Sequence, residues 1–235
     1  MAVSLNVLEN LKAAPDAERA LANYRELASD YDASCSRIEA LRLLAVRALR
    51  LQPGETVFDI ACGTGPLLPL LARTVGSNGR VVGVEHSPEM ATLARRRVER
   101  LRLGNHVSIL QCPVEQLDSD LQADALLFCY AHDVLQSPAA IDRLIQRSRP
   151  GARIAMVGMK TLPWLWGWPV NCFNMYRARQ YLTTYAGLDR PWRLLERRSA
   201  QLCEIDTALW GSAYLTVGRL AGTTTAYTQP EKETV

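Results

Sequence analysis

The stretch Val57-Phe58-Asp59-Ile60-Ala61-Cys62-Gly63-Thr64-Gly65 decides the fold. It begins as an apolar run that is typical of a buried β-strand, and it then becomes a loop of small residues. A leucine-rich helical segment follows, and a second apolar run ends at Glu85. Strand, glycine loop, helix, strand and acid, in this order, are typical of a nucleotide-binding βαβ unit. The glycines let the backbone approach a ligand closely, and the acid can accept hydrogen bonds from ribose hydroxyl groups.

The same alternation of apolar runs and helical segments continues along the chain. It predicts one α/β domain, a mixed sheet with helices on both faces and an antiparallel pair of strands at the C-terminal end. The expected strands are 56–60, 81–85, 107–111, 125–130, 152–159, 202–209 and 212–219. Ser87-Pro88 and Pro138 mark the starts of two of the helices between them. Ligands of such sheets bind beyond the carboxyl ends of the strands, where the strand order reverses.

The chain divides by composition into a core and its additions. Two helical segments, 18–32 and 36–51 with Ser36 as N-cap, come first, and a region rich in aromatic residues follows the fifth strand. In that region we expect helices over about 174–186 and 192–199. The expected units are a helical N-terminal segment (1–51), a nucleotide-binding core (52–160), an aromatic-rich helical insert (161–200), a β-hairpin (201–221) and a polar tail (222–235).

Charge and cysteine usage narrow the classes of function. A net charge of +3 over 235 residues is too small to indicate nucleic-acid binding. The six cysteines show no CxxC spacing and the three histidines no metal-ligand spacing, which favours a metal-free cytoplasmic protein with reduced thiols. The N-terminus lacks a signal-peptide pattern, and the apolar run near 162–170 is too short for stable membrane insertion. The arginines between Arg95 and Arg102 indicate a solvated helix face or a contact with phosphate or lipid.

The glycine loop departs from a dinucleotide-binding fingerprint. That fingerprint has a third glycine where this chain has Leu68, and it usually stays apolar where this chain has Asp59. An NAD-dependent enzyme or a non-catalytic nucleotide-binding module is therefore disfavoured. The set Asp59-x-Ala61-x-Gly63-x-Gly65, the acid at Glu85 and the loop at Glu115 is more specific than the glycines alone.

With these motifs, residues 24–220 resemble the class I S-adenosylmethionine-dependent methyltransferases, in particular small bacterial members related to quinone methyltransferases. The resemblance implies a Rossmann-like, seven-stranded fold and S-adenosylmethionine as cofactor. It implies that the glycine loop passes the methionine moiety, that the acid after the second strand holds the ribose, and that residues after the third strand flank adenine. It also implies that the N-terminal segment 1–51 is a lid over the cofactor and that the aromatic insert 161–200 is a cap over the substrate. The cofactor-binding residues implied are Tyr31, Asp59, Ala61, Gly63, Gly65, Glu85, His86, Met90, Val114, Glu115 and Tyr130.

Two residues depart from the family pattern. Ala61 stands at the usual first glycine, which is a small change if its φ angle is negative. Pro113 stands where an acid commonly reaches the adenine amino group. That contact passes to Glu115 or is weaker in this chain.

The chemistry is expected at two places. The first is Tyr130-Ala-His132-Asp133, where Tyr130 lies next to the cofactor and His132 is either a base or a capping and packing residue. The second is the aromatic region, which is a pocket lid, part of the core, or a foothold on a membrane or a lipophilic substrate. The candidate catalytic residues are Tyr130, His132 and Tyr176, and the candidate substrate contacts are Trp164, Asn171, Tyr176 and Arg177.

The leading hypothesis is methyl transfer from S-adenosylmethionine to a small molecule, without nucleic acid and with a homodimer as one possible assembly. The alternative is intramolecular cyclisation of S-adenosylmethionine to azetidine-2-carboxylate and methylthioadenosine, or aminocarboxypropyl transfer, which has the same leaving group. The aromatic surplus and the lack of a clear base keep this alternative open. The sequence does not choose between them, because substrate specificity lies in the aromatic region.

Overall fold

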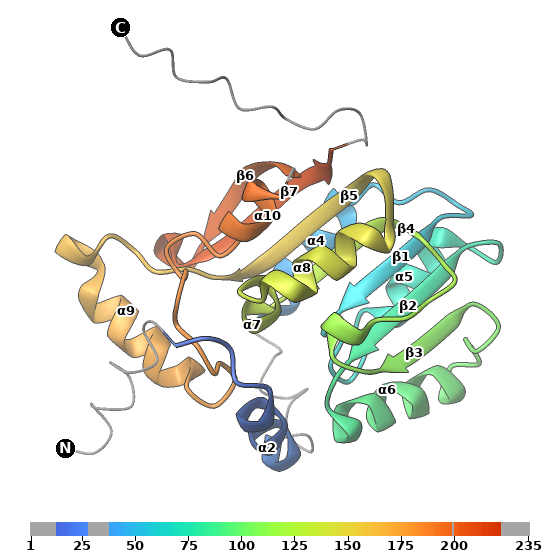
Figure 1. Ribbon diagram of the computed structural model, residues 1–235, viewed down its shortest axis with the longest axis horizontal. Helices are drawn as coiled ribbons and strands as arrows, with labels where there is room; N and C mark the ends of the chain where they lie inside the picture. The colour runs from blue at the N-terminus through green and yellow to red at the C-terminus, as the bar shows by residue number, and fades with distance from the viewer. Residues whose placement is uncertain (1–12, 28–37, 199, 222–235) are drawn as a thin grey trace, which may run out of the picture.

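The computed structural model describes residues 13–27, 38–198 and 200–221. Its centre is a seven-stranded sheet in the order β3-β2-β1-β4-β5-β7-β6 (Figure 1). The strands are β1 (Thr56–Ile60), β2 (Arg80–Glu85), β3 (Val107–Gln111), β4 (Ala123–Cys129), β5 (Ser148–Met159), β6 (Ala200–Ala208) and β7 (Ala213–Leu220).

The sheet is parallel from β1 to β5, whereas β7 runs antiparallel to both β5 and β6. The predicted Rossmann-like mixed sheet with an antiparallel C-terminal pair is therefore confirmed. The strand order reverses between β1 and β4, so the loops that follow these two strands diverge and leave room for a ligand.

Helices cover both faces of the sheet because its strands are apolar on both sides. Every residue of β1 is buried, with Phe58 and Ile60 in one core and Val57 in the other. The Phe58 core includes residues of the helices α7 (His132–Leu135), α8 (Pro138–Gln146) and α10 (Arg193–Arg197). The Val57 core includes residues of α4 (Glu39–Ala48), α5 (Leu68–Val75) and α6 (Pro88–Arg100).

The helix starts follow local sequence signals. Ser87 caps α6 by accepting a hydrogen bond from the Met90 backbone N–H at 3.3 Å, and Ser137 caps α8 in the same way. Both helices have proline in the first turn, as predicted. Short 3₁₀ turns, η2 (Val114–Gln116) and η3 (Leu209–Gly211), complete the loop after β3 and the turn between β6 and β7.

The N-terminal segment has two roles in the fold. Helix α2 (Ala17–Leu27) lies by the carboxyl ends of the strands, whereas α4 packs into the core behind the sheet. Ser36, the predicted N-cap of the second helix, lies outside the described residues, and α4 begins after Ile38. The lid therefore consists of α2 and the residues before it, within the part of the chain that the structure describes.

Two boundary predictions were wrong. Strand β5 begins at Ser148 rather than at Ala152, because Pro150 and Gly151 fit at an irregularity in its pairing with β4, and proline tolerates such a position. The aromatic region forms α9 over Trp164–Ala178 instead of a helix over 174–186. Pro169 lies in the second turn of α9.

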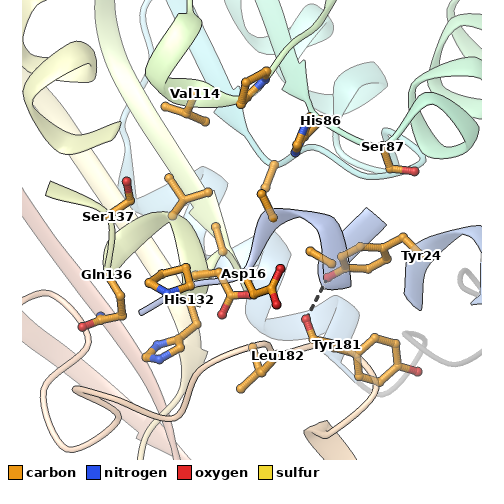
Figure 2. A pocket seen from close by; sticks show the side chains of 18 of the residues that line it. Asp16, Tyr24, His86, Ser87, Val114, His132, Gln136, Ser137, Tyr181 and Leu182 are labelled. Atoms are coloured by element: carbon orange, nitrogen blue, oxygen red, sulfur yellow. Dashed lines mark hydrogen bonds between the residues drawn. The ribbon is translucent and has the colours of Figure 1, made fainter. Parts of the chain in front are cut away.

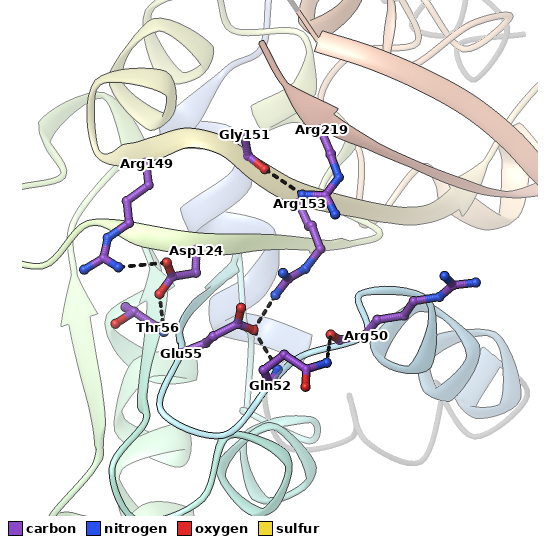
Figure 3. A network of polar contacts seen from close by, with 9 residues as sticks. All are labelled: Arg50, Gln52, Glu55, Thr56, Asp124, Arg149, Gly151, Arg153 and Arg219. Carbon is purple, nitrogen blue, oxygen red and sulfur yellow. Dashed lines mark hydrogen bonds and ion pairs between the residues drawn. The ribbon is translucent and has the colours of Figure 1, made fainter. Parts of the chain in front are cut away.

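A polar network ties the amino ends of the strands at the edge opposite the ligand side (Figure 3). The Thr56 backbone N–H donates to Asp124 Oδ2 at 2.8 Å, and Arg149 pairs with the other oxygen of that carboxylate at 3.0 Å. Arg153 of β5 pairs with Glu55, just before β1. These contacts fix the strands at one end and leave the loops at the other end for function.

The loop after β1 carries backbone strain. Ala61 has φ +54°, in the left-handed region that glycine adopts without cost, so the condition under which alanine would be a small change is not met. Tyr130, which follows β4, has φ +59°. Residues other than glycine adopt this conformation only where the surrounding structure enforces it, and such positions cluster at functional sites.

We expect Ala61→Gly to stabilise the fold. The left-handed conformation costs an alanine about 1–2 kcal/mol, and glycine loses about 0.4–1 kcal/mol more backbone entropy on folding. The net gain in the free energy of unfolding is therefore about 0.5–1 kcal/mol, measured by urea denaturation. Ala72→Gly inside α5 is the matched control and should destabilise the protein. If Ala61→Gly lowers the free energy of unfolding, the inference that Ala61 is strained is wrong.

Candidate functional site

A cavity of about 630 Å³ lies beyond the carboxyl ends of the parallel strands and is covered by α2 (Figure 2). Its volume is within the range of small-molecule sites, about 300–1,000 Å³. The walls come from four strand ends, from α2 and from the segment after α9. Those from the strand ends include Ala61, Gly63, Glu85, His86, Ser87, Pro113, Val114, Glu115, Tyr130, His132 and Asp133.

Glu85 is the anchored acid of the cavity. Its Oε2 accepts a hydrogen bond from the Gly63 backbone N–H at 2.9 Å, and its Oε1 accepts one from the Ser87 backbone N–H at 2.7 Å. Burial raises the pKa of this carboxyl, and the two N–H donors partly offset the shift. The carboxylate therefore joins the loop after β1 to the start of α6 and turns toward the cavity.

The opposite walls differ in character. Figure 2 shows His86 and Val114 on one side of the cavity and His132 and Leu182 on the other. Met90, buried in the first turn of α6, lines the same cavity. The side at the ends of β2 and β3 has apolar surface from Val114 and Met90. The side at the end of β4, with His132 and Asp133, is more polar, and we call it the polar wall.

His132 is buried but electrically neutral. It begins α7, its side chain lines the cavity, and neither ring nitrogen has a hydrogen-bond partner among the described residues. Burial lowers the pKa of His132 to about 4, and the nearby backbone of Ala186 opposes this shift only in part. Buried polar atoms without partners are rare in folded proteins, so the His132 ring is an unusual feature of this part of the cavity.

A hydrogen-bonded junction holds α2 over the cavity. Thr183 donates its hydroxyl to Asp133 Oδ2 at 2.6 Å, and its backbone N–H donates to the same oxygen at 3.0 Å. The Thr183 hydroxyl also accepts from the Asp16 backbone N–H at 2.9 Å. At the far end of α2, the Tyr24 hydroxyl donates to the Tyr181 carbonyl at 3.3 Å (Figure 2). The lid is thus fixed to the segment after α9 at two points.

The cavity is acidic. Four carboxyl side chains contribute to its lining, and the described lining residues include no lysine or arginine. Burial also raises the pKa of Asp133, although its hydrogen bonds with Thr183 oppose the shift. Such a lining favours a ligand that carries positive charge and disfavours an anion. The four acids are Asp16, Glu85, Glu115 and Asp133.

Most of the predicted cofactor contacts meet in this cavity, but two of the described ones do not. Asp59 and Gly65 do not line it, and Tyr31 lies outside the described residues. Asp59 is buried behind the glycine loop, where burial raises its pKa to about 7 while Arg42 opposes the shift. Those that line it are Ala61, Gly63, Glu85, His86, Met90, Val114, Glu115 and Tyr130.

The predicted substrate contacts lie elsewhere. Trp164, Asn171, Tyr176 and Arg177 belong to α9 and do not line the cavity. Both ends of the Asn171 amide group bond to the backbone of Leu162. The Asn171 Oδ1 atom accepts from the Leu162 N–H at 2.8 Å, and Nδ2 donates to the Leu162 carbonyl at 2.9 Å. Tyr176, the third candidate catalytic residue, is 53% exposed.

The sequence reasoning missed the first turn of α2 and the segment after α9. Asp16 Oδ1 accepts a hydrogen bond from the Arg19 backbone N–H at 3.0 Å, so Asp16 is the N-cap of α2. Aspartate at this position is a sequence signal that could have predicted the start of the helix. Leu182 and Ala186 also line the cavity. No local signal marks them, because their place depends on how α9 packs.

The buried state of His132 predicts a pH dependence of stability. The unfolded chain binds a proton at this residue below about pH 6.5, whereas the folded chain does so only near pH 4. The free energy of unfolding therefore falls as the pH is lowered through this window, by at most about 1.4 kcal/mol per pH unit.

The His132→Asn protein lacks this titration, so its free energy of unfolding relative to that of the wild type should rise as the pH is lowered from 6.5 to 4.5. Urea denaturation of both proteins across the range measures the difference, in which the other titrating groups cancel. A constant difference across the range would refute a buried, neutral His132.

The comparisons with known proteins agree with the fold. A family model described as a methyltransferase domain matches residues 51–191. A 2-phytyl-1,4-naphtoquinone methyltransferase from Trichormus variabilis is 32% identical over 116 residues, 48% of this chain and 51% of that protein. A probable cobalt-precorrin-6B C(15)-methyltransferase from Thermoplasma acidophilum is 34% identical over 86 residues, 37% of this chain and 43% of that protein. The chain thus spans about half the length of these curated relatives, or less.

Solved structures share the fold at low sequence identity. The YcgJ protein from Bacillus subtilis superposes with a TM-score of 0.62 at 14% identity, covering 77% of this chain and 97% of that one. A geranyl diphosphate C-methyltransferase from Streptomyces coelicolor gives a TM-score of 0.60 at 16% identity, covering 78% and 79%. The [4+2]-cyclase SpnF gives 0.58 at 14% identity, covering 78% and 82%.

Two further features of the described residues bear on the class of site. None of the helices in these ranges is long and apolar enough to span a membrane. The side chains described there also contain no group of three histidine, cysteine, aspartate or glutamate residues arranged to hold a metal ion.

Proposed function

Because the chain belongs to the methyltransferase domain family, we propose that it binds S-adenosylmethionine in this cavity and transfers the methyl group to a small molecule. The observation that carries the proposal is the position of Glu85. Its carboxylate is fixed by the Gly63 and Ser87 N–H groups at the end of β2 and lines the cavity. This is the place where an acid can accept hydrogen bonds from two ribose hydroxyl groups.

The remaining lining residues fit the rest of such a cofactor. Val114 and Met90 provide apolar surface for an adenine ring between the ends of β2 and β3. Gly63, with φ +59°, brings bare backbone to the cavity beside Glu85. The acidic lining suits a molecule that carries a sulfonium and an ammonium group.

When bound, S-adenosylmethionine supplies an electrophilic methyl group on a positively charged sulfur. The protein's task is then to orient the acceptor in line with that methyl group and to exclude water. Tyr130, held in its strained conformation at the end of β4, places an aromatic side chain at the polar wall, and aromatic faces stabilise cations.

His132 is suited to positioning rather than to strong base catalysis. Its pKa of about 4 leaves the imidazole neutral at physiological pH, so it holds a proton only weakly. Its neutral imidazole lines the cavity and so shapes the wall against which the acceptor would lie. The acceptor that fits this cavity is uncharged or cationic and partly apolar, because no cationic side chain among the described lining residues would pair with an anion.

One of the two features that favoured self-cyclisation of the cofactor, the aromatic surplus, is largely missing from the cavity. The aromatic surplus that favoured it lies largely on α9, away from the cavity. Methyl transfer is therefore the proposal, and self-cyclisation is an outcome that the test can reveal.

The direct test is mass spectrometry of the purified protein incubated with S-adenosylmethionine, first alone and then with a panel of uncharged hydroxylated, quinol and amine acceptors. We expect little turnover alone, and S-adenosylhomocysteine with a product heavier by one methylene unit when an acceptor fits. Methylthioadenosine from the cofactor alone would overturn methyl transfer in favour of cyclisation.

The cofactor pose predicts the effect of Glu85→Gln. A hydrogen bond to a charged group contributes about 1.5–3 kcal/mol, so we expect S-adenosylhomocysteine to bind at least about tenfold more weakly by calorimetry. Glu99→Gln, which removes the same charge from the outer face of α6, is the matched control. Thermal unfolding without ligand shows whether Glu85→Gln still folds. Unchanged affinity in a folded Glu85→Gln protein would refute the assignment.

A further inference from the structure

Helix α9 exposes an unusual amount of apolar surface. Leu165 is 94% exposed, and Trp166 and Phe173 are each 61% exposed. Trp164, Trp168 and Tyr176 on the same helix are more than half exposed as well. Figure 1 shows α9 at one end of the molecule, beside the sheet rather than across it.

Only one stripe of α9 faces its own chain. Gly167, Asn171 and Met175, spaced four residues apart, are buried. Gly167 lies so close to Leu162 that a Cβ atom there would come within 2.3 Å of the Leu162 Cβ. The apolar side chains on the rest of the circumference are uncovered, and a helix that is apolar on all sides is normally buried.

The exposed area matches what a stable protein interface needs. An aromatic side chain buries about 150–250 Å², so the exposed fractions of the five aromatic residues of α9 correspond to roughly 400–700 Å². Leu165 adds to this area. The whole exposed surface of α9 approaches the ~800 Å² that each partner contributes to a standard interface, and it lies at the upper end of what monomeric proteins expose. A contact through α9 reaches that size only when it covers the residues that flank the outward face as well as the face itself.

The composition of α9 favours a protein partner over a bilayer. The helix contains no lysine, aspartate or glutamate, and Arg177 is its only charged residue. Interfacial membrane helices have one apolar face and one strongly charged face, which α9 lacks. Tryptophan, tyrosine, phenylalanine, methionine and arginine, in contrast, are the residues enriched in protein interfaces.

We propose that α9 packs antiparallel against α9 of a second copy of this chain. Leu165, Pro169, Cys172 and Tyr176 recur at i, i+4, i+7 and i+11, which places them along one outward face for an isologous contact. An antiparallel pair sets the tryptophan-rich first half of one helix against the second half of the other. Arg177 then lies over aromatic faces, whereas a parallel pair would bring the two arginines together.

This contact would also support the proposed active site, although it does not depend on it. Met175, on the inner stripe of α9, packs with Leu182 and Tyr185, and Leu182 lines the cavity. The segment that fastens α2 over the cavity is therefore connected to the helix that the second copy would cover.

The test is the mass of the full-length protein in solution by sedimentation velocity at micromolar concentrations, with and without anionic lipid vesicles. We expect twice the 26.1 kDa of one chain for the wild type. Leu165→Glu combined with Phe173→Glu should give a monomer with an unchanged circular dichroism spectrum. The matched control is Leu101→Glu, at 45% exposure at the end of α6 on the other side of the molecule (Figure 1), and it should remain a dimer.

Cys172 reports the orientation of the two helices. It is exposed and lies near the middle of α9, so an antiparallel pair brings the two copies of this residue together. A short bismaleimide should cross-link the wild type and Cys203→Ser, but not Cys172→Ser. A monomeric wild type, a dimer that survives the double substitution, or a monomer that floats with vesicles would each overturn the proposal. A dimer without cross-linking at Cys172 would overturn the antiparallel arrangement.

Discussion

The buried carboxylate of Glu85 is the interaction on which the site depends. Two backbone N–H groups, from Gly63 and Ser87, hold its oxygens at 2.9 and 2.7 Å. A buried charge is stable only when it is hydrogen-bonded, so this side chain dictates the path of both loops around it. The loop after β1 follows that path at the cost of a left-handed Ala61, and the first turn of α6 begins where Ser87 can serve as its cap.

The polar wall of the cavity differs from the Glu85 side, because some of its buried polar atoms have no hydrogen-bond partner among the described residues. The ring nitrogens of His132 and the Oδ1 atom of Asp133 are buried without hydrogen-bond partners among the described residues. A buried polar atom without a hydrogen-bond partner lowers the stability of the fold unless a bound molecule supplies that partner. These unpartnered atoms therefore lie at the end of β4, whereas both oxygens of Glu85 at the end of β2 are hydrogen-bonded.

The parts of the site that the sequence predicted share one property: each follows directly from a strand end. Gly63, Glu85, Val114 and Tyr130 come after consecutive parallel strands, and parallel strands bring their carboxyl ends to one edge whatever the side-chain packing. Asp59 does not line the cavity: it alternates with Phe58 and Ile60 along β1 and lines a smaller pocket with Arg42 and Cys129 instead.

The sequence by itself determined the order of strands and helices, the cap of α6, the start of α8 at Pro138 and the acid at the end of β2, because these depend on periodicity and on neighbours in the chain. Only the tertiary structure decided the role of the aromatic region. Its composition suits a pocket lid, a core or a docking surface equally well. The choice depends on which face of α9 meets Leu162, and the buried stripe of Gly167, Asn171 and Met175 turns the aromatic residues outward, away from the cavity.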